Sequence, residues 1–145
     1  MVLRLLNRLD GVHTVHNTIL MGTAYVSGRV PLRFERLVVK QARAARTSKS
    51  NLVARYVVEK TLEHEFPGIS FRDSLSGREA YVTGRRVAVW EVVESYNEFK
   101  SVECTAGHFD WPQVLVKRAL AYAKAFPEEI KRSREGERHG VPALD

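Results

Sequence analysis

The stretch that decides the fold is GRRVAVWEVVESYNEFKSVECTAGHFDWPQVLVKRALAYAKAFPEEI, residues 84–130. It contains three short segments with helical spacing of apolar residues. In the first segment the residues at i, i+4 and i+7, one face of a helix, are Val89, Val93 and Tyr96. The pattern breaks around residues 97–100, and Ser101 then supplies the side-chain oxygen that an N-cap needs. Glu103 falls in the first turn of this second helix, where the helix dipole favours an anion. The apolar stripe of the second helix consists of Val102, Ala106 and Phe109.

A third helix is expected to begin at Asp110, a residue type that caps helix N-termini. Trp111 and Pro112 would occupy its first turn, where a missing N–H costs nothing. Its apolar face consists of Leu115, Ala119, Tyr122 and Phe126, and its polar face of Gln113, Lys117 and Lys124. Three short helices with tight turns predict a helix-turn-helix, in which Gln113 and Lys117 would contact DNA.

A short β-hairpin is predicted directly before these helices. Ile69 and Phe71 alternate with polar residues, residues 74–77 have the composition of a turn, and residues 80–82 form a second strand. We therefore expect residues 67–126 to form a helix-turn-helix-like domain with a small wing.

The same part of the chain resembles a known family. The run GREAYVTGRRVAV, residues 77–89, has a glycine, an apolar strand, a glycine-led turn with Arg and a valine-rich helix start. The ending ALAYAKAFPEE, residues 119–129, has an Ala-Leu-x-Tyr helix followed by Pro-Glu-Glu. Over residues 69–130 the chain is thus similar to the bacterial and archaeal family called domain of unknown function four-thirty-three. The resemblance implies a helix-turn-helix-like antitoxin that works beside a PIN-type ribonuclease toxin.

Length and composition limit the class of protein. A chain of 145 residues can bury a core as one domain or two small ones. One cysteine excludes an internal disulfide framework and fits a reducing compartment, and no apolar run approaches the roughly 20 residues of a membrane span. We therefore expect a cytoplasmic protein. A net charge of +6 suits nucleic acid, an acidic partner or an anionic membrane surface.

The positive charge is concentrated in one segment. Residues 29–60 contain nine Lys or Arg against two Glu, a net charge of +7, so the rest of the chain sums to −1. Residues 87–110 contain one Lys against five acidic residues, a net charge of −4. Because the DNA backbone attracts positive charge, we expect the main DNA contact within residues 29–60.

Residues 29–66 resemble a ribbon-helix-helix repressor. Residues 29–35 alternate strictly between polar and apolar side chains, which predicts a strand. Two helices are predicted to follow, over residues 36–46 and 51–64, with capping hydroxyls in the turn between them. The predicted fold is therefore mainly α with short strands, with a ribbon-helix-helix-like unit before the helix-turn-helix-like unit.

The ribbon-helix-helix resemblance implies a homodimer on double-stranded DNA. The strands of two chains would pair and enter the major groove, so that Arg29, Pro31 and Arg33 face bases. The backbone amides of Ser48, Lys49 and Ser50, at a helix N-terminus, would hold phosphate. The alternative is an ordinary strand and helical hairpin whose basic residues are a solvated face.

The two ends of the chain carry weaker signals. Residues 1–28 are expected to be an N-terminal extension, with Met21 as an alternative start. Residues 127–145 are highly charged with little to bury, which predicts a flexible tail. The resemblance implies a toxin with a carboxylate cluster, and the cations of the tail that could bind it are Lys131, Arg132, Arg134 and Arg138. The alternative is a solubilising tail that makes no contact.

No feature of the sequence indicates catalysis, a metal or a cofactor. Cys104 and His108 share a helix face, but two ligands without a second cluster make a weak metal site, so we expect Cys104 to be buried as a small hydrophobe.

The sequence predicts a dimeric, DNA-binding, antitoxin-like autorepressor. The alternative is a protein-interaction module that acts through its helix-turn-helix-like domain and does not bind DNA. An RNA-binding accessory protein is disfavoured, because the sequence offers no evident exposed aromatic platform.

Overall fold

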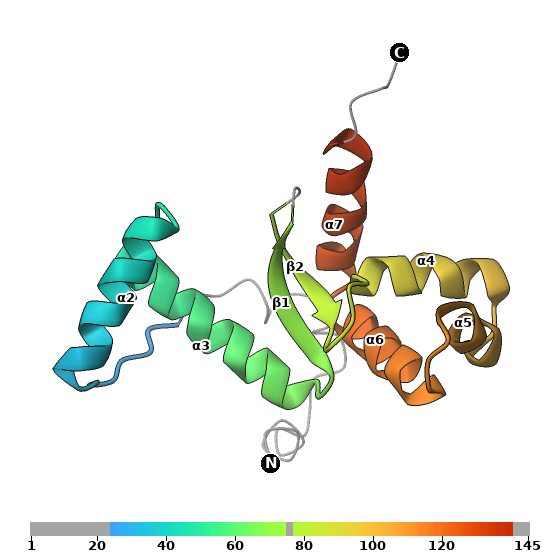
Figure 1. Cartoon of the computed structure of the whole chain (residues 1–145), viewed down its shortest axis with the longest axis horizontal. Coiled ribbons are helices and arrows are strands. Elements are labelled where there is room, and N and C mark those ends of the chain that lie inside the picture. The colour runs from blue at the N-terminus through green and yellow to red at the C-terminus, as the bar shows by residue number, and fades with distance from the viewer. Residues whose placement is uncertain (1–23, 75–76, 141–145) are drawn as a thin grey trace, which may run out of the picture. The chain divides into compact units, whose positions relative to one another are not determined.

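The computed structural model describes residues 24–74 and 77–140, with side chains described as far as Glu137. These residues are mainly helical, with one two-stranded antiparallel sheet (Figure 1), which confirms a mainly α fold with short strands. The elements in chain order are α2 (Leu32–Ala44), α3 (Lys49–Glu65), β1 (Ile69–Ser74), β2 (Gly77–Val82), α4 (Val89–Phe99), α5 (Val102–Phe109), α6 (Gln113–Ala125) and α7 (Pro127–Gly140). The chain divides into two compact units, a first unit that ends at Leu37 and a second unit from Val38 onwards.

The prediction of a strand over residues 29–35 is wrong, because α2 begins at Leu32. The carbonyl oxygen of Pro31 accepts from the N–H groups of Phe34 and Glu35, at N···O distances of 2.9 and 3.3 Å. Proline is favoured at a helix start, since its φ is preset and its missing N–H would have no partner there. A strand also needs a neighbour for its hydrogen bonds, and neither described strand pairs with this segment. Arg33 therefore lies in the first turn of a helix.

The N-terminal extension is only partly described. Residues 1–23 lie outside the described residues, and so do residues 141–145 of the predicted tail. Residues 24–31 have no regular secondary structure and are exposed.

The predicted turn and N-cap before α3 are confirmed. The Ser48 hydroxyl oxygen accepts from the N–H of Asn51 at 3.1 Å and closes the first turn of α3. Leu52 is buried, and the Tyr56 hydroxyl donates to the Gln41 side chain at 2.8 Å, which ties α3 to the end of α2. The helix ends where the N–H of Phe66 bonds to the Leu62 carbonyl.

The predicted hairpin is confirmed, with β1 and β2 paired antiparallel from Ile69↔Val82 to Ser74↔Gly77. Ile69 of β1 and Ala80 and Val82 of β2 are the buried apolar residues of this hairpin. Gly68 precedes β1 with a φ of +98°, and a Cβ built there would lie 2.9 Å from the Cδ atom of Arg118 on α6. A left-handed backbone and this close approach both favour glycine.

The three predicted helices of residues 89–126 are confirmed as α4, α5 and α6. The predicted N-cap of α5 is also confirmed, since the Ser101 hydroxyl accepts from the N–H of Cys104. The predicted cap at Asp110 is wrong. Asp110 ends α5 with a φ of 54°, and α6 begins at Gln113 with Pro112 as its N-cap. Aspartate tolerates the left-handed conformation that ends a helix, so it serves here as a C-cap.

One hydrophobic core joins the hairpin to α4, α5, α6 and α7. Its fully buried members include Val89, Val92, Val116, Ala119 and Tyr122. The Tyr122 ring makes edge contacts with the rings of Phe66 and Phe71, at centroid distances of 5.3 and 6.1 Å.

The prediction of a flexible tail is wrong for residues 127–140, which form α7. Ile130 on α7 is only 8% exposed and belongs to the core, and α7 contacts α4 and α6. A single buried isoleucine and the polar contact described below hold a helix whose other residues are mostly charged, so composition alone concealed it.

Candidate functional site

The basic residues of the segment 29–60 are exposed, with the exception of the half-buried Arg55. Arg29 and Arg33, predicted to contact DNA, are exposed in the first unit, where the Arg33 guanidinium lies over the Phe34 ring at 5.0 Å. Ser48, Lys49 and Ser50 are exposed at the N-terminus of α3 in the second unit. Each predicted contact in this segment is therefore accessible to solvent and to an anionic ligand.

Large apolar side chains are exposed in the same part of the chain. Those of the first unit are Tyr25, Val26, Val30, Leu32, Phe34 and Leu37, and those of α3 are Val53, Tyr56, Val57 and Val58. Tyr25 is 92% exposed and Val26 is 73% exposed. Soluble monomers rarely expose so many large apolar side chains in one stretch, and such surfaces are typical of protein interfaces.

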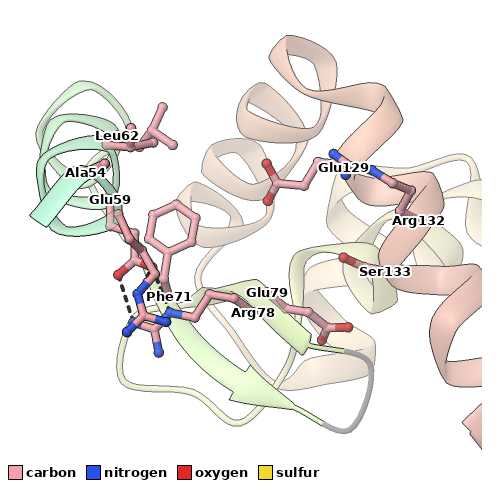
Figure 2. A pocket seen from close by; sticks show the side chains of 11 residues that line it. Ala54, Glu59, Leu62, Phe71, Arg78, Glu79, Glu129, Arg132 and Ser133 are labelled. Carbon is pink, nitrogen blue, oxygen red and sulfur yellow. Dashed lines mark hydrogen bonds and ion pairs between the residues drawn. The ribbon is translucent and has the colours of Figure 1, made fainter. Parts of the chain in front are cut away.

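A cleft of about 550 Å³ lies between α3, the hairpin and α7 (Figure 2). Its apolar lining comes mainly from Ala54, Val58, Leu62 and Phe71. Its charged lining is balanced, with Arg55, Arg78 and Arg132 against Glu59, Glu79 and Glu129. Because the two signs cancel, the cleft does not concentrate the charge of one sign that attracts a phosphate or a metal ion.

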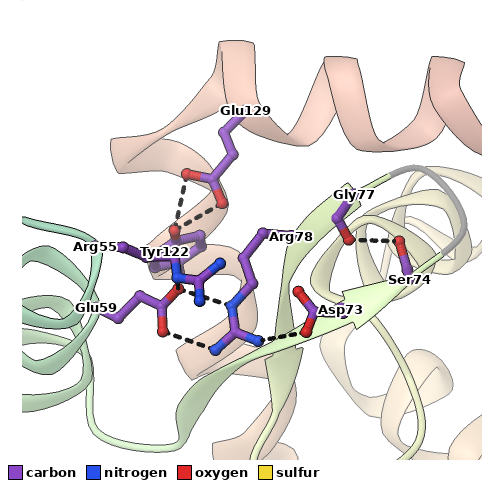
Figure 3. A network of polar contacts seen from close by, with 8 residues as sticks. All are labelled: Arg55, Glu59, Asp73, Ser74, Gly77, Arg78, Tyr122 and Glu129. Atoms are coloured by element: carbon purple, nitrogen blue, oxygen red, sulfur yellow. Dashed lines mark hydrogen bonds and ion pairs between the residues drawn. The ribbon is translucent and has the colours of Figure 1, made fainter. Parts of the chain in front are cut away.

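An ion-pair network that includes Glu59 and Arg78 lines one side of this cleft (Figure 3). Arg78 donates from Nε and Nη2 to the two carboxylate oxygens of Glu59, at 2.7 and 2.8 Å, and its Nη1 lies 3.4 Å from Asp73. These hydrogen bonds to Glu59 raise the pKa of the Arg78 guanidinium above its usual value. The network joins α3 to both strands of the hairpin, which is a structural role.

A second polar contact connects α6 to α7. The Tyr122 hydroxyl donates to the Glu129 carboxylate, whose two oxygens both lie 2.9 Å away. Burial raises the pKa of Glu129, although the bond from Tyr122 opposes that shift. Burial, assisted by the charge of Glu129, also raises the pKa of Tyr122. The contact therefore holds an incompletely solvated carboxylate against the core.

The remaining predicted site residues lie on helices of the second unit. Gln113 and Lys117 are exposed on α6, and Lys131 and Arg132 are exposed on α7. Arg134 Nε lies 3.9 Å from Glu94 of α4, so part of its charge is directed inward. Arg138 belongs to α7, but its side chain lies outside the described part of the chain.

The expectation of a buried Cys104 is wrong, because its side chain is exposed on α5. Among the described residues, no three His, Cys, Asp or Glu side chains gather as a metal site would require. No described helix is long and apolar enough to cross a membrane.

Sequence reasoning missed the two polar contacts that shape the cleft. Glu59 and Arg78 are 19 residues apart in the sequence, and no local pattern relates them. Tyr122 and Glu129 are seven residues apart, but a helix end at Ala125 separates them. The only available signal was the pair of adjacent glutamates after Pro127, which are typical of a helix first turn.

Comparison with known proteins gives no relative: no family model, no curated protein and no solved structure matches this chain.

The raised pKa of Glu129 predicts how stability depends on pH. Between the ordinary carboxyl pKa and the raised value, the folded state binds more protons than the unfolded state, so the free energy of unfolding falls as pH rises. Glu129→Gln should abolish this fall, because the amide cannot ionise but still offers an oxygen to Tyr122. Urea unfolding at several pH values between about 4 and 7 measures how the free energy of unfolding changes with pH. The exposed neighbour Glu128→Gln is the matched control, and equal effects of the two variants would contradict the prediction.

Proposed function

We propose that this protein is a DNA-binding, antitoxin-like autorepressor that acts as a homodimer. The observation that carries the proposal is the coincidence, within residues 24–60, of exposed positive charge with exposed apolar side chains. Positive charge supplies affinity for the phosphate backbone, and apolar exposure in a single chain calls for a second chain to cover it.

The strand of the proposed ribbon lies earlier than residues 29–35. Residues 24–30 precede Pro31 without regular structure, so they are available to pair with the same segment of a second chain. In an extended chain alternate side chains share one face. Val26 and Val30 would then face the protein interior, and Tyr25, Ser27 and Arg29 would face DNA.

The N-terminus of α3 is the proposed phosphate contact. Ser48, Lys49 and Ser50 are exposed there, and the positive end of the helix dipole favours an anion. Backbone amides and Lys49 at this position would fix the register of the dimer on the duplex without reading bases.

The later helices are proposed to contribute less to DNA binding. Gln113 and Lys117 are exposed on α6, as a recognition helix in a helix-turn-helix would require. However, residues 87–110 carry a net charge of −4, and this charge opposes the approach of a polyanion. We therefore assign α6 at most an auxiliary contact.

The antitoxin role rests on the resemblance of residues 69–130 and on the exposed cations of α7. Lys131 and Arg132 can approach a carboxylate cluster such as a PIN-type ribonuclease holds, and Arg pairs with carboxylates through two parallel hydrogen bonds.

A protein-interaction module without DNA binding is the second candidate function. The acidic character of residues 87–110 and the exposed residues of α5 favour it. The two candidates differ in what the segment 29–60 does: it binds an operator in the first and only keeps the protein soluble in the second.

The dimer is tested by a matched pair of charged substitutions. Val30→Lys should yield monomers in sedimentation, because it places a charge in the proposed interface between two strands. Ser27→Lys adds the same charge to the opposite side of an extended strand and should leave the dimer intact. A monomeric wild-type protein, or an unaffected Val30→Lys dimer, would contradict the pairing.

DNA binding is tested by gel shift against the DNA upstream of this gene at several salt concentrations. The double variant Arg29→Ala/Lys49→Ala should lower the slope of log affinity against log salt by about 1.8 per chain, since each phosphate contact contributes about 0.9. The control Gln113→Ala/Lys117→Ala should change the slope by about half of that or less. The reverse order would move the DNA contact to α6, and no binding by wild type would favour the interaction module.

The toxin contact is tested by charge reversal rather than by deletion, because removing α7 would also remove the buried Ile130. Lys131→Glu/Arg132→Glu should release a PIN-type toxin encoded beside this gene, measured by co-purification and by growth of cells that express both. Lys124→Glu on the exposed side of α6 is the control. Retention of the toxin by the double variant would show that α7 is not its contact.

A further inference from the structure

A continuous row of rings runs along the junction of α4, α5 and α6. The Phe99 ring lies 5.3 Å from His108, His108 lies 4.8 Å from Phe109, and Phe109 stacks on Trp111 at 4.7 Å with an interplanar angle of 22°. The Arg85 guanidinium covers the far end of the row, 5.5 Å from the Trp111 ring. At the near end Phe99 is 37% exposed and His108 is exposed, so two rings face solvent.

The outer face of α5 continues this row. Glu103 and Gly107 are four residues apart, as are Cys104 and His108, and all four are exposed. Residues with this spacing lie beside one another on a helix. The inner face of the same helix is buried through Thr105 and Ala106.

Gly107 at the centre of this face has no structural explanation within the chain. A Cβ built on it meets no atom within 4 Å, and its φ is not positive. Glycine inside a helix costs about 1 kcal/mol relative to alanine. Its absent side chain leaves open space over this turn of α5, where another backbone can approach closely.

Three carboxylates lie close in sequence to the residues that bear these rings. Glu98, Glu103 and Asp110 are exposed, and within the described residues no ion pair is formed by any of them. By contrast, Glu59, Glu63 and Glu94 all pair with cations. With Lys100 as their one lysine or arginine, residues 87–110 keep a net charge of −4, so this segment is complementary to a cation.

We propose that this ring-lined surface, formed by Phe99, Gly107 and His108 with Glu98, Glu103 and Asp110 around it, binds a cationic helix of a partner protein. Lysines or arginines of that helix pair with the three carboxylates and lie against the exposed rings. Small residues of the helix meet Gly107, where the absent side chain allows two helix backbones to approach.

Other occupants fit less well. Single-stranded nucleic acid would stack on Phe99 and His108, but the three carboxylates repel its phosphates. A second copy of this face would bring the same carboxylates against one another, which is destabilising. The inference goes beyond the proposed toxin contact of α7, because it assigns a different surface and a cationic partner, and it does not depend on DNA binding.

The test is an NMR titration of the full-length protein with a synthetic amphipathic helix that carries lysines on one face and alanines and leucines on the other. Amide shifts should concentrate at Phe99, Gly107 and His108. Gly107→Arg should weaken binding at least about tenfold, a loss of about 1.4 kcal/mol, because its side chain blocks close approach to α5 and adds a charge like that of the lysines. Glu103→Lys should weaken binding in the same direction.

Two controls accompany this titration. Gly107→Ala should fold at least as well as wild type, since its Cβ meets open space and alanine favours helices, and it should lose much less affinity than Gly107→Arg. A peptide with glutamate in place of each lysine should not bind.

Any of the following results would overturn the inference: shifts centred elsewhere or absent, unchanged binding by Gly107→Arg, equal binding of the glutamate peptide, or preferential binding of a single-stranded oligonucleotide to the same residues. A change of sedimenting mass in Gly107→Arg without peptide would assign the surface to a second copy and would overturn it too. Operator binding, measured on the same samples, keeps the two proposals distinct. Loss of the peptide site with operator binding intact counts only against this surface, and absence of operator binding counts only against the proposed function.

Discussion

The burial of Tyr122 is the interaction on which the second unit depends. Its ring is fully buried and contacts Phe66 at the end of α3, Phe71 on β1 and Phe126 after α6. Its hydroxyl donates to Glu129 on α7. A buried hydroxyl without a partner would cost about 1–3 kcal/mol, so the position of α7 is coupled to the packing of the ring. One side chain thereby connects a helix, a hairpin and two further helices.

Charges of opposite sign are concentrated in different segments of the chain. The cleft between α3, the hairpin and α7 contains paired charges, such as the bonds from Arg78 to Glu59, and is close to neutral. The basic residues of 29–60 remain largely exposed, and Glu98, Glu103 and Asp110 form no ion pair among the described residues. The exposed basic residues and these carboxylates therefore lie on different elements of the chain.

The apolar residues that stay exposed need a different explanation. Val26 and Val30 lie on a segment without regular structure, and Val53 and Val57 lie one turn apart on α3. Edge-exposed apolar segments are a hazard for aggregation unless another chain covers them. The proposed pairing of two chains through residues 24–30 would cover Val26 and Val30, and for that reason dimerisation and DNA binding are proposed together.

The sequence alone determined the elements whose signals are local. Periodic apolar residues and the Ser101 cap located α4, α5 and α6, alternation located the hairpin, and Ser48 located the start of α3.

Tertiary structure decided the elements whose local sequence pattern predicts a different secondary structure from the one they form. Residues 29–35 alternate like a strand, but the helix α2 begins within them, directly after Pro31. A strand without a partner has no hydrogen bonds to stabilise it. Charge in 127–140 was outweighed by Ile130 and by the bond from Tyr122 to Glu129, contacts between residues that no local pattern relates. The row of rings from Phe99 to Trp111 also depends on tertiary structure. Periodicity assigns a side chain to one face of a helix, but it does not show which faces of the packed helices stay exposed.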